Sequence, residues 1–468
     1  MASPFTGNRA FIALVLLGLG LRLAALPLPG TGDVMVFKIW AHAGATGRVS
    51  EMYGVGGTPL ERRVHDYDGR STTVDYPPVA LYELALAGLA YSAVFPGFPH
   101  TAALTAAVKI LPVAAEAGLL WLLVISVRRL LPDRPELARW SGLAWWLNPA
   151  TLLTSAALGY VDALFVLPAV GALIAASSQQ AVLAGALVGV AVLTKPQAVF
   201  IVPVVGLALW GQRKPGHVLS SQGRPAVAGV AAAVTGSVLL APVVAVGAWR
   251  NLLQALGSFG RHDMLSGQAP NLWWVVTWIM RAAYEVSGVG IAAAYLEPVL
   301  RPLAISTIVQ LGYPNPRFGA TAAMMSAIAW GVWKGRRVRD LPRLALLGAW
   351  VVYAYFMLSV QVHENHFVLM LPLLAIAAAV IPRWRTPFWI LSAIFALNLY
   401  FFYGLGEGTG PAVPRTITGI DATVVLSIAN LGVFIWFGRQ LGGCLDSQDF
   451  TLTSGREGTR HQQESWSR

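Results

Sequence analysis

The sequence predicts an all-α membrane protein: a polytopic helical bundle of about 12–14 transmembrane helices, with a long first outer loop that contains juxtamembrane helices. Composition carries this prediction. Apolar residues make up 56% of the 468 residues and charged residues only 12%, roughly half the charged share of a soluble domain. The mean hydropathy is +0.60. So few charges cannot cover a soluble surface, which excludes a soluble enzyme and a disordered protein. The single cysteine, Cys444, excludes an intrachain disulfide scaffold.

The net charge of +11 would suggest a nucleic-acid partner if the protein were soluble. Here the basic residues cluster in short loops between apolar runs, as the positive-inside rule expects. We therefore expect no nucleic-acid partner and place four basic loops on the cytoplasmic side. These loops contain Arg128, Arg129, Arg134 and Arg139; Arg213, Lys214 and Arg224; Lys334, Arg336, Arg337, Arg339 and Arg343; and Arg383 and Arg385.

The first apolar run, 11–28, is interpreted as an uncleaved first span, because no small-residue cleavage site follows it. Residues 30–77 then lie outside. The next run, 79–96, is short and contains an acidic residue, whereas 102–126 is a convincing span. If both runs crossed, the arginines at 128–139 would also lie outside. We therefore expect 79–96 to be a helix at the outer interface, or one that dips into it.

The remaining apolar runs alternate between the two sides of the membrane. Residues 248–270 are expected outside, and the region 271–333 contains one or three spans. Residues 1–437 therefore form one transmembrane unit, in which 30–101 is the outer loop with its juxtamembrane helices. Residues 438–468 form a cytoplasmic tail that we expect to be disordered. The other spans are expected at about 140–158, 160–178, 181–194, 197–211, 226–247, 342–360, 367–382, 387–403 and 419–437.

The outer loop 30–77 is too long for a plain connection, and loops of this length are usually functional or disordered. Asp33 is followed by Phe37 and Trp40 at helical spacing, so we expect a short helix along the membrane. Two interpretations of Asp33 stay open: a helix cap or a functional carboxylate. Further along, Asp66-Tyr67-Asp68 could bind a divalent ion or form a solvated acidic loop.

Three further polar features fall on the same outer side. The loop ends in Val74-Asp75-Tyr76-Pro77-Pro78, Tyr160 and Asp162 follow a span, and the segment 361–366 separates two apolar runs. Charged residues at such depth usually face a cavity. Simpler interpretations are a helix start, a cap formed by Asp162, and a solvated turn. The segment 361–366 is not the zinc motif H-E-x-x-H, because its two histidines are three residues apart.

In order along the chain, these segments resemble the GT-C superfamily of membrane glycosyltransferases. In particular, they are similar to the dolichyl-phosphate-glucose-dependent glucosyltransferases of N-glycan assembly and to bacterial relatives that use polyprenyl-phosphate sugars. The resemblance runs across about 33–366. The matching segments are Gly32-Asp33 with Phe37 and Trp40, Asp75-Tyr76-Pro77-Pro78, Asn148-Pro149, Gly159-Tyr160-Val161-Asp162, Lys195-Pro196-Gln197, Asn271-Leu272-Trp273 and Val362-His363-Glu364-Asn365.

Two departures from that family pattern bear on the chemistry. Asn365 stands where the family carries a lysine, so one positive charge expected near the lipid phosphate is missing, and His366 is the neighbour that could replace it. The first-loop motif also lacks the second acidic residue and the arginine of the eukaryotic enzymes. The sugar and the acceptor therefore do not follow from the resemblance.

The resemblance implies transfer of a hexose or similar sugar from a polyprenyl-phosphate sugar donor to a glycan, glycolipid or protein acceptor. It implies Asp33 as the general base for the acceptor hydroxyl, a contribution of about 10²–10⁴-fold. The leaving phosphate must be neutralised. Residues expected to bind donor or sugar are Asp75, Tyr76, Asp162, Lys195, His363, Glu364 and His366, with Arg250 or Arg261 as further candidates.

One acid acting on a sugar phosphate fits a single inverting displacement, whereas a double displacement needs a second carboxylate close by. We expect no cofactor and no metal, because basic residues can neutralise a lipid monophosphate. The alanine-, glycine- and arginine-rich composition suggests a bacterium with a GC-rich genome. The protein would then lie in the plasma membrane with its active site on the outer face.

Two other classes of function compete with the transferase. A lipid or sugar transporter or flippase would also have many spans, but its functional polar residues would lie near the bilayer midplane. A membrane scaffold without catalysis would tolerate replacement of Asp33 by asparagine. The order of the motifs favours the transferase.

Overall fold

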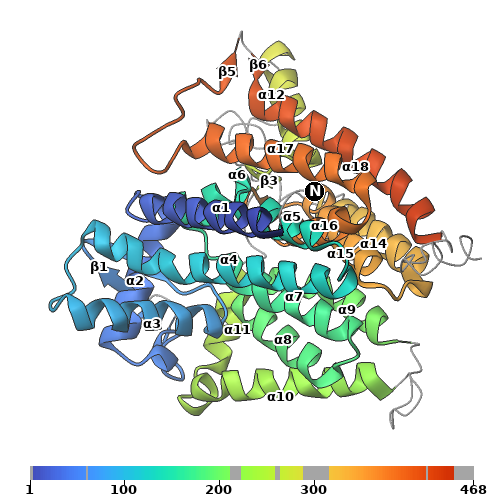
Figure 1. Cartoon of the computed structure of the whole chain (residues 1–468). Helices are drawn as coiled ribbons and strands as arrows, with labels where there is room; N and C mark the ends of the chain where they lie inside the picture. Colours follow the sequence, from blue (N-terminus) through green and yellow to red (C-terminus); the bar gives the residue numbers. More distant parts are fainter. Residues whose placement is uncertain are drawn as a thin grey trace, which may run out of the picture.

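The computed structural model describes residues 4–59, 62–210, 223–258, 264–287, 316–417 and 420–446. Within these ranges the chain is built almost entirely from helices, and the strands form three short pairs. Many of the helices run side by side across the molecule in Figure 1. The fold therefore agrees with the predicted all-α class.

Six of the described helices are long and apolar enough to cross a membrane. These candidate spans are Asn8–Ala25 within α1 (Pro4–Ala25), α4 (Ala102–Leu130), α10 (Gly223–Ala245), α15 (Leu341–Leu358), Pro382–Tyr403 with α17 (Arg385–Tyr403), and α18 (Ala422–Asp446). Shorter apolar helices are α3 (Pro78–Val94), α7 (Ala163–Ser177), α8 (Ala181–Thr194), the 3₁₀ turn Pro196–Ile201 with α9 (Val202–Leu209), and α16 (Met370–Val380). These helices indicate an integral membrane protein. The number of crossings, about 12–14, stays a prediction.

The remaining elements connect and cover the spans. The helices are α2 (Gly32–Thr46), α5 (Pro135–Trp146), α6 (Pro149–Thr151) followed by a π-helical turn (Leu152–Ala157), α11 (Trp249–Ser258), α12 (Leu272–Ser287) and α14 (Pro316–Lys334). The strand pairs are β1 (Val64–Tyr67) with β2 (Arg70–Thr73), β3 (Ser266–Gly267) with β4 (Val362–His363), and β5 (Thr416–Ile417) with β6 (Ile420–Asp421). The pair β3–β4 is parallel and joins two distant segments of the chain.

The helices α2 and α3 cross closely because glycines lie at their contact. Gly88 of α3 lies against the backbone carbonyl of Ala41, and a Cβ at Gly88 would come within 2.1 Å of that oxygen. Only glycine permits such an approach. The helix predicted at 79–96 is therefore present as α3. It also contacts α4, α8 and α10 and runs beside α4 in Figure 1, which fits a helix that dips into the bilayer.

The span predicted at 140–158 is broken at Asn148-Pro149. Proline cannot continue the hydrogen-bond ladder of α5, and Asn148 caps the next turn by accepting from the amide of Ala150 at 3.0 Å. The π-helical turn that follows ends at Ala157, and the chain then passes through Gly159, whose φ of +81° favours glycine. This irregular path places Tyr160 at the end of the bundle opposite the basic loops.

The core of the bundle is formed by α15 and α16. Met370–Ala379 of α16 are all buried, and α15 is buried along nearly its whole length. A charge inside the first span is accommodated where α1 meets α4 and α5. Arg22 of α1 is buried, donates to Glu116 of α4 at 2.6 Å, and lies over the ring of Trp146 at 3.7 Å. The pairing explains how a charged residue is tolerated within that apolar run.

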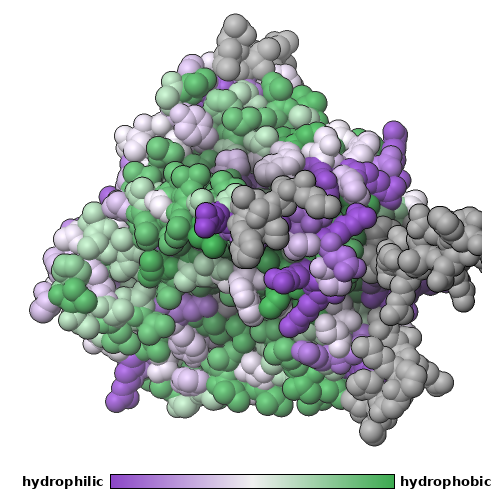
Figure 2. Space-filling view, viewed as in Figure 1, coloured by the Kyte–Doolittle hydropathy of each residue, from purple (hydrophilic) through white to green (hydrophobic). Residues whose placement is uncertain are grey.

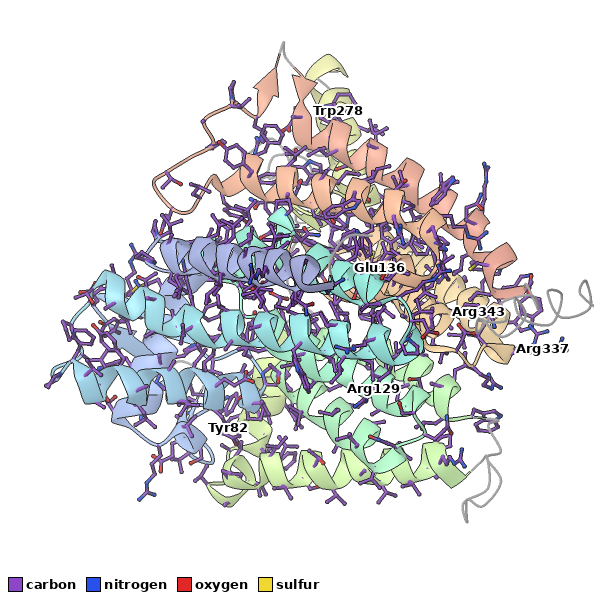
Figure 3. The ribbon with its side chains drawn as sticks, viewed as in Figure 1. Tyr82, Arg129, Glu136, Trp278, Arg337 and Arg343 are labelled. Atoms are coloured by element: carbon purple, nitrogen blue, oxygen red, sulfur yellow. The ribbon has the colours of Figure 1, made fainter. Side chains whose placement is uncertain are left out.

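The basic loops gather at one end of the bundle. Arg129, Arg337 and Arg343 lie toward the same side in Figure 3, and many hydrophilic residues gather there in Figure 2. Near this end, α18 continues to Asp446, which pairs with Lys334 at 2.8 Å. The boundary predicted at residue 437 is therefore wrong, because 438–446 extend the helix. The rest of the predicted tail, 447–468, lies outside the described residues.

Candidate functional site

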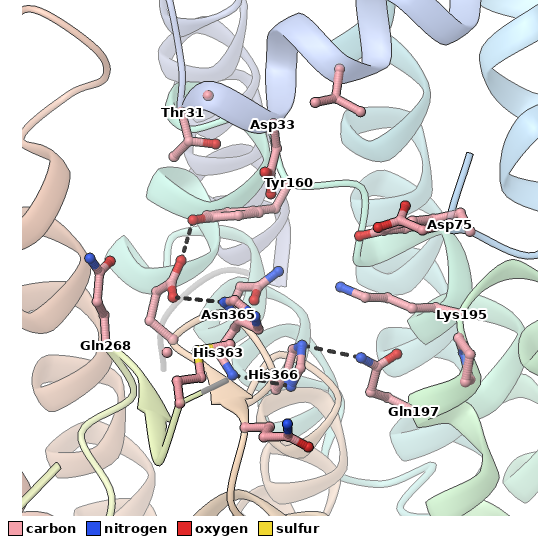
Figure 4. Close-up of a pocket in the computed structure, with 18 of the residues that line it drawn as sticks. Thr31, Asp33, Asp75, Tyr160, Lys195, Gln197, Gln268, His363, Asn365 and His366 are labelled. Atoms are coloured by element: carbon pink, nitrogen blue, oxygen red, sulfur yellow. Dashed lines mark hydrogen bonds and ion pairs between the residues drawn. The ribbon is translucent and has the colours of Figure 1, made fainter. Parts of the chain in front are cut away.

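A cavity of about 640 Å³ lies at the end of the bundle opposite the basic loops. Both α8 and α15 begin near the basic loops and end at this cavity, one helix length away. The start of α2, the segment 74–76, the turn after α8 and the segment 361–366 all contribute to its walls. In Figure 4 the side chains of Asp33, Asp75 and Lys195 reach toward this space from different elements. The fold thus brings together the outer features that the sequence singled out.

Asp33 is placed by the first turn of α2. Thr31 occupies the N-cap position, so the interpretation of Asp33 as the cap is wrong. Its side chain lines the cavity and is accessible from it. In the described part of the chain it makes no hydrogen bond or ion pair, so both carboxylate oxygens can meet a ligand. Burial below the protein surface raises the pKa of Asp33, and the negative charge of Glu364 raises it further.

Asp75 and Tyr76 close the outer loop and form a second wall of the cavity. The ring of Tyr76 packs on Trp40 and Phe37, with centroids 5.4 and 6.1 Å apart. Its carbonyl accepts from the hydroxyl of Tyr53 at 2.6 Å. This packing fixes the Asp75 carboxylate beside Asp33. Burial raises the pKa of Asp75 to about 6, and the charge of Asp33 contributes to the shift.

Lys195 provides a rigidly held positive charge. It follows α8, is almost fully buried, and donates to Oδ1 of Asp162 at 2.7 Å. The second oxygen of Asp162 accepts from the amide of Asn365, also at 2.7 Å. Burial alone would lower the pKa of Lys195, but the charge and the hydrogen bond of Asp162, together with the charges of Tyr76 and Asp33, raise it overall. Lys195 is therefore charged and lines the cavity with its remaining N–H groups.

Glu364 is held by two tyrosines. Its Oε1 accepts from the hydroxyl of Tyr160 and, at 2.9 Å, from that of Tyr403. Its Oε2 lies 3.8 Å from Nδ1 of His363. The side chain is only 2% exposed, so the interpretation of 361–366 as a solvated turn is wrong. Burial raises the pKa of Glu364, although the hydroxyl of Tyr160 opposes this by donating to the carboxylate.

His366 connects the segment 361–366 with Gln197 and Tyr355, which also line the cavity. Its Nε2 lies 3.1 Å from the side-chain amide of Gln197, and its Nδ1 lies 2.8 Å from the hydroxyl of Tyr355 (Figure 4 draws the Gln197 contact). The backbone amide of His363 also approaches Nδ1 of His366, at 3.4 Å. These contacts fix the ring orientation of His366 toward the side of the cavity that holds Lys195.

A buried lysine outside the cavity connects two of the segments that lead to it. Lys109 of α4 donates to the carbonyls of Leu28, Ala156 and Ala157 at 2.6, 3.3 and 2.7 Å. These carbonyls belong to the segments that lead to Asp33 and to Tyr160. The amide of Thr31 bonds to the carbonyl of Leu158 at 2.9 Å, which joins the same two segments directly.

Most of the predicted site residues meet in this cavity, with two exceptions. Asp162 does not line it, and its side chain forms no cap. Both of its oxygens accept hydrogen bonds, from Lys195 and Asn365, and this arrangement favours a structural role over contact with a sugar. Arg250 is exposed and packs over Trp249, away from the lining residues. The other arginine candidate, Arg261, lies outside the described residues.

The predicted divalent site at Asp66-Tyr67-Asp68 is not formed as a cluster. Asp66 accepts from Ser71, whereas Asp68 pairs with His100. Within the described ranges, no group of three or more histidine, cysteine, aspartate or glutamate side chains is arranged to hold a metal ion. Asn271 also has a structural role: it caps α12 by accepting from the amide of Trp274, and it donates to the carbonyl of Phe356.

Several residues of the cavity escaped the sequence reasoning. They include Tyr355, Tyr403 and Gln268, and the hydroxyl oxygen of Tyr403 lies 2.5 Å from the side-chain oxygen of Gln268. Both tyrosines lie near the ends of apolar runs, where tyrosine is common simply as an interface anchor. Gln268 follows β3, and only the pairing of β3 with β4 brings it beside His363.

The described charged groups of the cavity are mostly acidic. Asp33, Asp75 and Glu364 all line it, whereas Lys195 is the one permanent cation among its described lining residues. The argument for a single displacement from a single acid therefore does not hold, because a second carboxylate is available. Such a site can accept a proton, bind hydroxyl groups and hold one anionic group at Lys195 and the histidines.

Comparison of the chain with models of known protein families finds no match, and comparison with curated proteins finds no similar protein.

Proposed function

We propose that the chain is a membrane glycosyltransferase that moves a hexose or similar sugar from a polyprenyl-phosphate sugar to a hydroxyl acceptor. The acceptor would be a glycolipid, polysaccharide or protein at the outer face. One observation carries the proposal: an unpaired carboxylate, Asp33, shares a cavity with a buried, charged Lys195. This is the pair of groups that a transfer from a sugar phosphate needs.

Asp33 is suited to act as the general base. A catalytic base must be free to reach the proton that it accepts. Asp33 meets this requirement, since its carboxylate has no partner in the described ranges and is accessible from the cavity. Its raised pKa makes it a stronger base than an ordinary aspartate.

Lys195 is suited to hold the leaving phosphate. Its ion pair with Asp162 fixes the ammonium before substrate arrives, and preorganised charge stabilises a leaving group without later rearrangement. His363 and His366 line the same cavity, although both ring nitrogens of His366 are already engaged by Gln197 and Tyr355. Val199, Phe200 and Val360 line an apolar side of the cavity, which could accommodate the first units of a prenyl chain.

The arrangement of charge supports an outward-facing site. The basic loops gather at one end of the bundle, and positive loops stay on the cytoplasmic side. The cavity lies at the other end, because α8 and α15 lead from the basic loops to it. If the basic end is cytoplasmic, the active site faces outward. Its polar residues gather at one end rather than at the midplane, which disfavours the transporter.

In the proposed step, the acceptor oxygen bonds to the anomeric carbon while the bond from that carbon to the phosphate oxygen breaks. The hydroxyl proton goes to Asp33, and the electron pair of the broken bond stays on the polyprenyl phosphate. We propose a single, metal-independent displacement that inverts the anomeric configuration. A double displacement through Asp75 or Glu364 would retain the configuration, so the product anomer separates the two mechanisms.

The test uses the purified full chain and a panel of short-chain polyprenyl-phosphate sugars, each incubated with membrane extract as the source of acceptor. Release of polyprenyl phosphate is measured for wild type, Asp33→Asn and Asp133→Asn, with and without EDTA. Asp133 is exposed at the basic end and is the matched control. We expect one donor to be consumed by wild type and Asp133→Asn, and at least about 10²-fold more slowly by Asp33→Asn.

Other outcomes would contradict parts of the proposal. Full activity of Asp33→Asn rejects the base, and loss of activity in EDTA rejects metal independence. If no donor is consumed under any condition, the transferase is rejected. Movement of labelled lipid between the leaflets of reconstituted vesicles would then support a flippase.

A further inference from the structure

A second cavity, of about 230 Å³, lies at the basic end of the bundle. It is formed where α4 and α7 end and where α15 begins. Its polar lining consists of Ser126, Arg129, Ser177, Ser178, Arg339 and Asp340. The proposed sugar transfer uses none of these residues, and the first cavity is a helix length away.

Ser126 is a buried hydroxyl that has no partner. It lies in the last turns of α4, is 4% exposed, and lines the cavity. Serine within a helix usually donates to a backbone carbonyl of the preceding turn. Ser177 on the facing helix does so, donating to the carbonyl of Ile174 at 2.8 Å. Ser126 makes no such bond in the described structure. A buried hydroxyl left unsatisfied calls for a ligand or an ordered water.

The charges around the cavity are unbalanced. Arg129 has no ion pair or hydrogen bond within the described ranges and lines the opening. Arg339 is anchored because its Nη1 donates to the carbonyls of Arg336 and Val338, at 2.9 and 2.6 Å. The carboxylate of Asp340 is already neutralised, because both of its oxygens accept from Arg343, at 3.0 and 2.6 Å. Arg129 therefore brings positive charge to a partly enclosed site, and Arg339 adds a second guanidinium group to its lining.

This combination of groups suits a phosphate. Guanidinium groups bind phosphate oxygens through paired hydrogen bonds, and serine hydroxyls supply further donors. Leu130, Ile174 and Leu341 also line the cavity, so an organic group attached to the phosphate would meet apolar side chains. Basic pockets between membrane helices bind lipid head groups in this way.

We propose that the cavity between α4, α7 and α15 binds a phosphate group, held by Arg129, Arg339 and Ser126. The phosphate comes either from the head group of an anionic lipid in the adjacent leaflet or from free phosphate. Both sources present the same oxyanion, and binding experiments can separate them. The inference is independent of the function proposed for the first cavity.

The test measures the apparent Tm of the detergent-solubilised full chain against increasing ligand. The probes are inorganic phosphate, dioctanoyl-phosphatidylglycerol, and dioctanoylglycerol, which has the same tails without a phosphate. The variants are Ser126→Ala, Arg129→Gln and Arg339→Gln. Arg128→Gln is the matched control, because Arg128 precedes Arg129 on α4, is exposed and does not line the cavity.

We expect at least one phosphate-containing probe to raise the Tm of wild type and Arg128→Gln, and dioctanoylglycerol to have no effect. Arg129→Gln and Arg339→Gln should each weaken apparent binding by about tenfold or more, because each removes a charge-assisted hydrogen bond. Ser126→Ala should weaken it by a smaller factor. Stabilisation by inorganic phosphate assigns a free phosphate, and stabilisation by the lipid alone assigns a head group.

Two results would overturn the proposal. If neither phosphate-containing probe raises the Tm above dioctanoylglycerol, the cavity binds no phosphate. If Arg128→Gln weakens binding as much as Arg129→Gln does, the interaction belongs to the basic surface as a whole. Arg129 is exposed, so its variant should fold, and the Tm of each variant without ligand verifies this.

Discussion

The ammonium of Lys195 and the carboxylate of Asp162 form an ion pair of 2.7 Å in which both side chains are almost fully buried. The other oxygen of Asp162 accepts from Asn365. Because Asn365 is uncharged, the negative charge of Asp162 balances the positive charge of Lys195 alone. A lysine at that position would place two cations against Asp162. Asn365 thus keeps this ion pair balanced, and Lys195 remains the permanent cation among the described residues that line the cavity.

The first prediction concerns this ion pair. Asp162→Asn should leave the buried ammonium of Lys195 without its counter-charge, which costs about 3–5 kcal/mol of the free energy of unfolding. The apparent Tm should fall clearly below that of Asp66→Asn, an aspartate in the exposed hairpin. The double variant Asp162→Asn with Lys195→Met should recover part of the stability but not the proposed transferase activity. Equal Tm values for Asp162→Asn and Asp66→Asn would contradict the prediction.

The second prediction follows from the raised pKa of Asp75, about 6. In the unfolded chain this carboxyl ionises near its ordinary value of 3.8, so the folded protein keeps a proton that the unfolded chain loses. Stability should therefore fall as pH rises from about 4 to 6, and the penalty persists above that range. Asp75→Asn removes the penalty. It should raise the apparent Tm near neutral pH, and the gain should vanish at about pH 4.

The measurement compares wild type, Asp75→Asn and the exposed control Asp133→Asn at a series of pH values. The control should follow wild type throughout. A destabilised Asp75→Asn near neutral pH would show that the ionised carboxylate is favourable in the folded protein, contrary to the prediction.

The sequence predicted the polar residues of the first cavity well because membrane proteins limit where charge can lie. Asp33, Asp75, Lys195 and the segment 361–366 all interrupt apolar runs on one predicted side, and the fold gathers them. Charge in an apolar chain is informative because each such group must face water, a partner or a cavity.

What the sequence could not predict was the pairing of these groups. Nothing local distinguishes Asp162, whose two oxygens both have partners, from Asp33, which has none among the described residues. The number of acids facing the cavity also depended on packing, since Glu364 enters it through the parallel pair β3–β4. Contacts of this kind join segments nearly a hundred residues apart, and neither periodicity nor spacing encodes them.

The third prediction concerns Lys109, the buried lysine that connects two segments leading to the cavity. Lys109→Met removes the donor to three carbonyls, and these carbonyls lie on the segments that carry Asp33 and Tyr160. A small misplacement of a catalytic group can reduce the rate by about 10²-fold. We expect a loss of that order in kcat with a smaller change in KM. Lys334→Met, at the basic end, is the matched control and should keep full activity. Equal activity of the two variants would show that Lys109 does not position the site.

The fourth prediction tests the close crossing of α2 and α3. Gly88→Ala would place a Cβ at 2.1 Å from the carbonyl oxygen of Ala41, so α2 and α3 must separate. Overpacking of this kind costs about 1–3 kcal/mol. Because α2 carries Asp33 at its start, transferase activity should fall together with the apparent Tm. Gly229→Ala in α10 is the control, since nothing lies within 4 Å of its Cβ position. That change should leave activity intact and add up to about 1 kcal/mol through higher helix propensity. If Gly88→Ala behaved like Gly229→Ala, the contact between α2 and α3 would be looser than the structure shows.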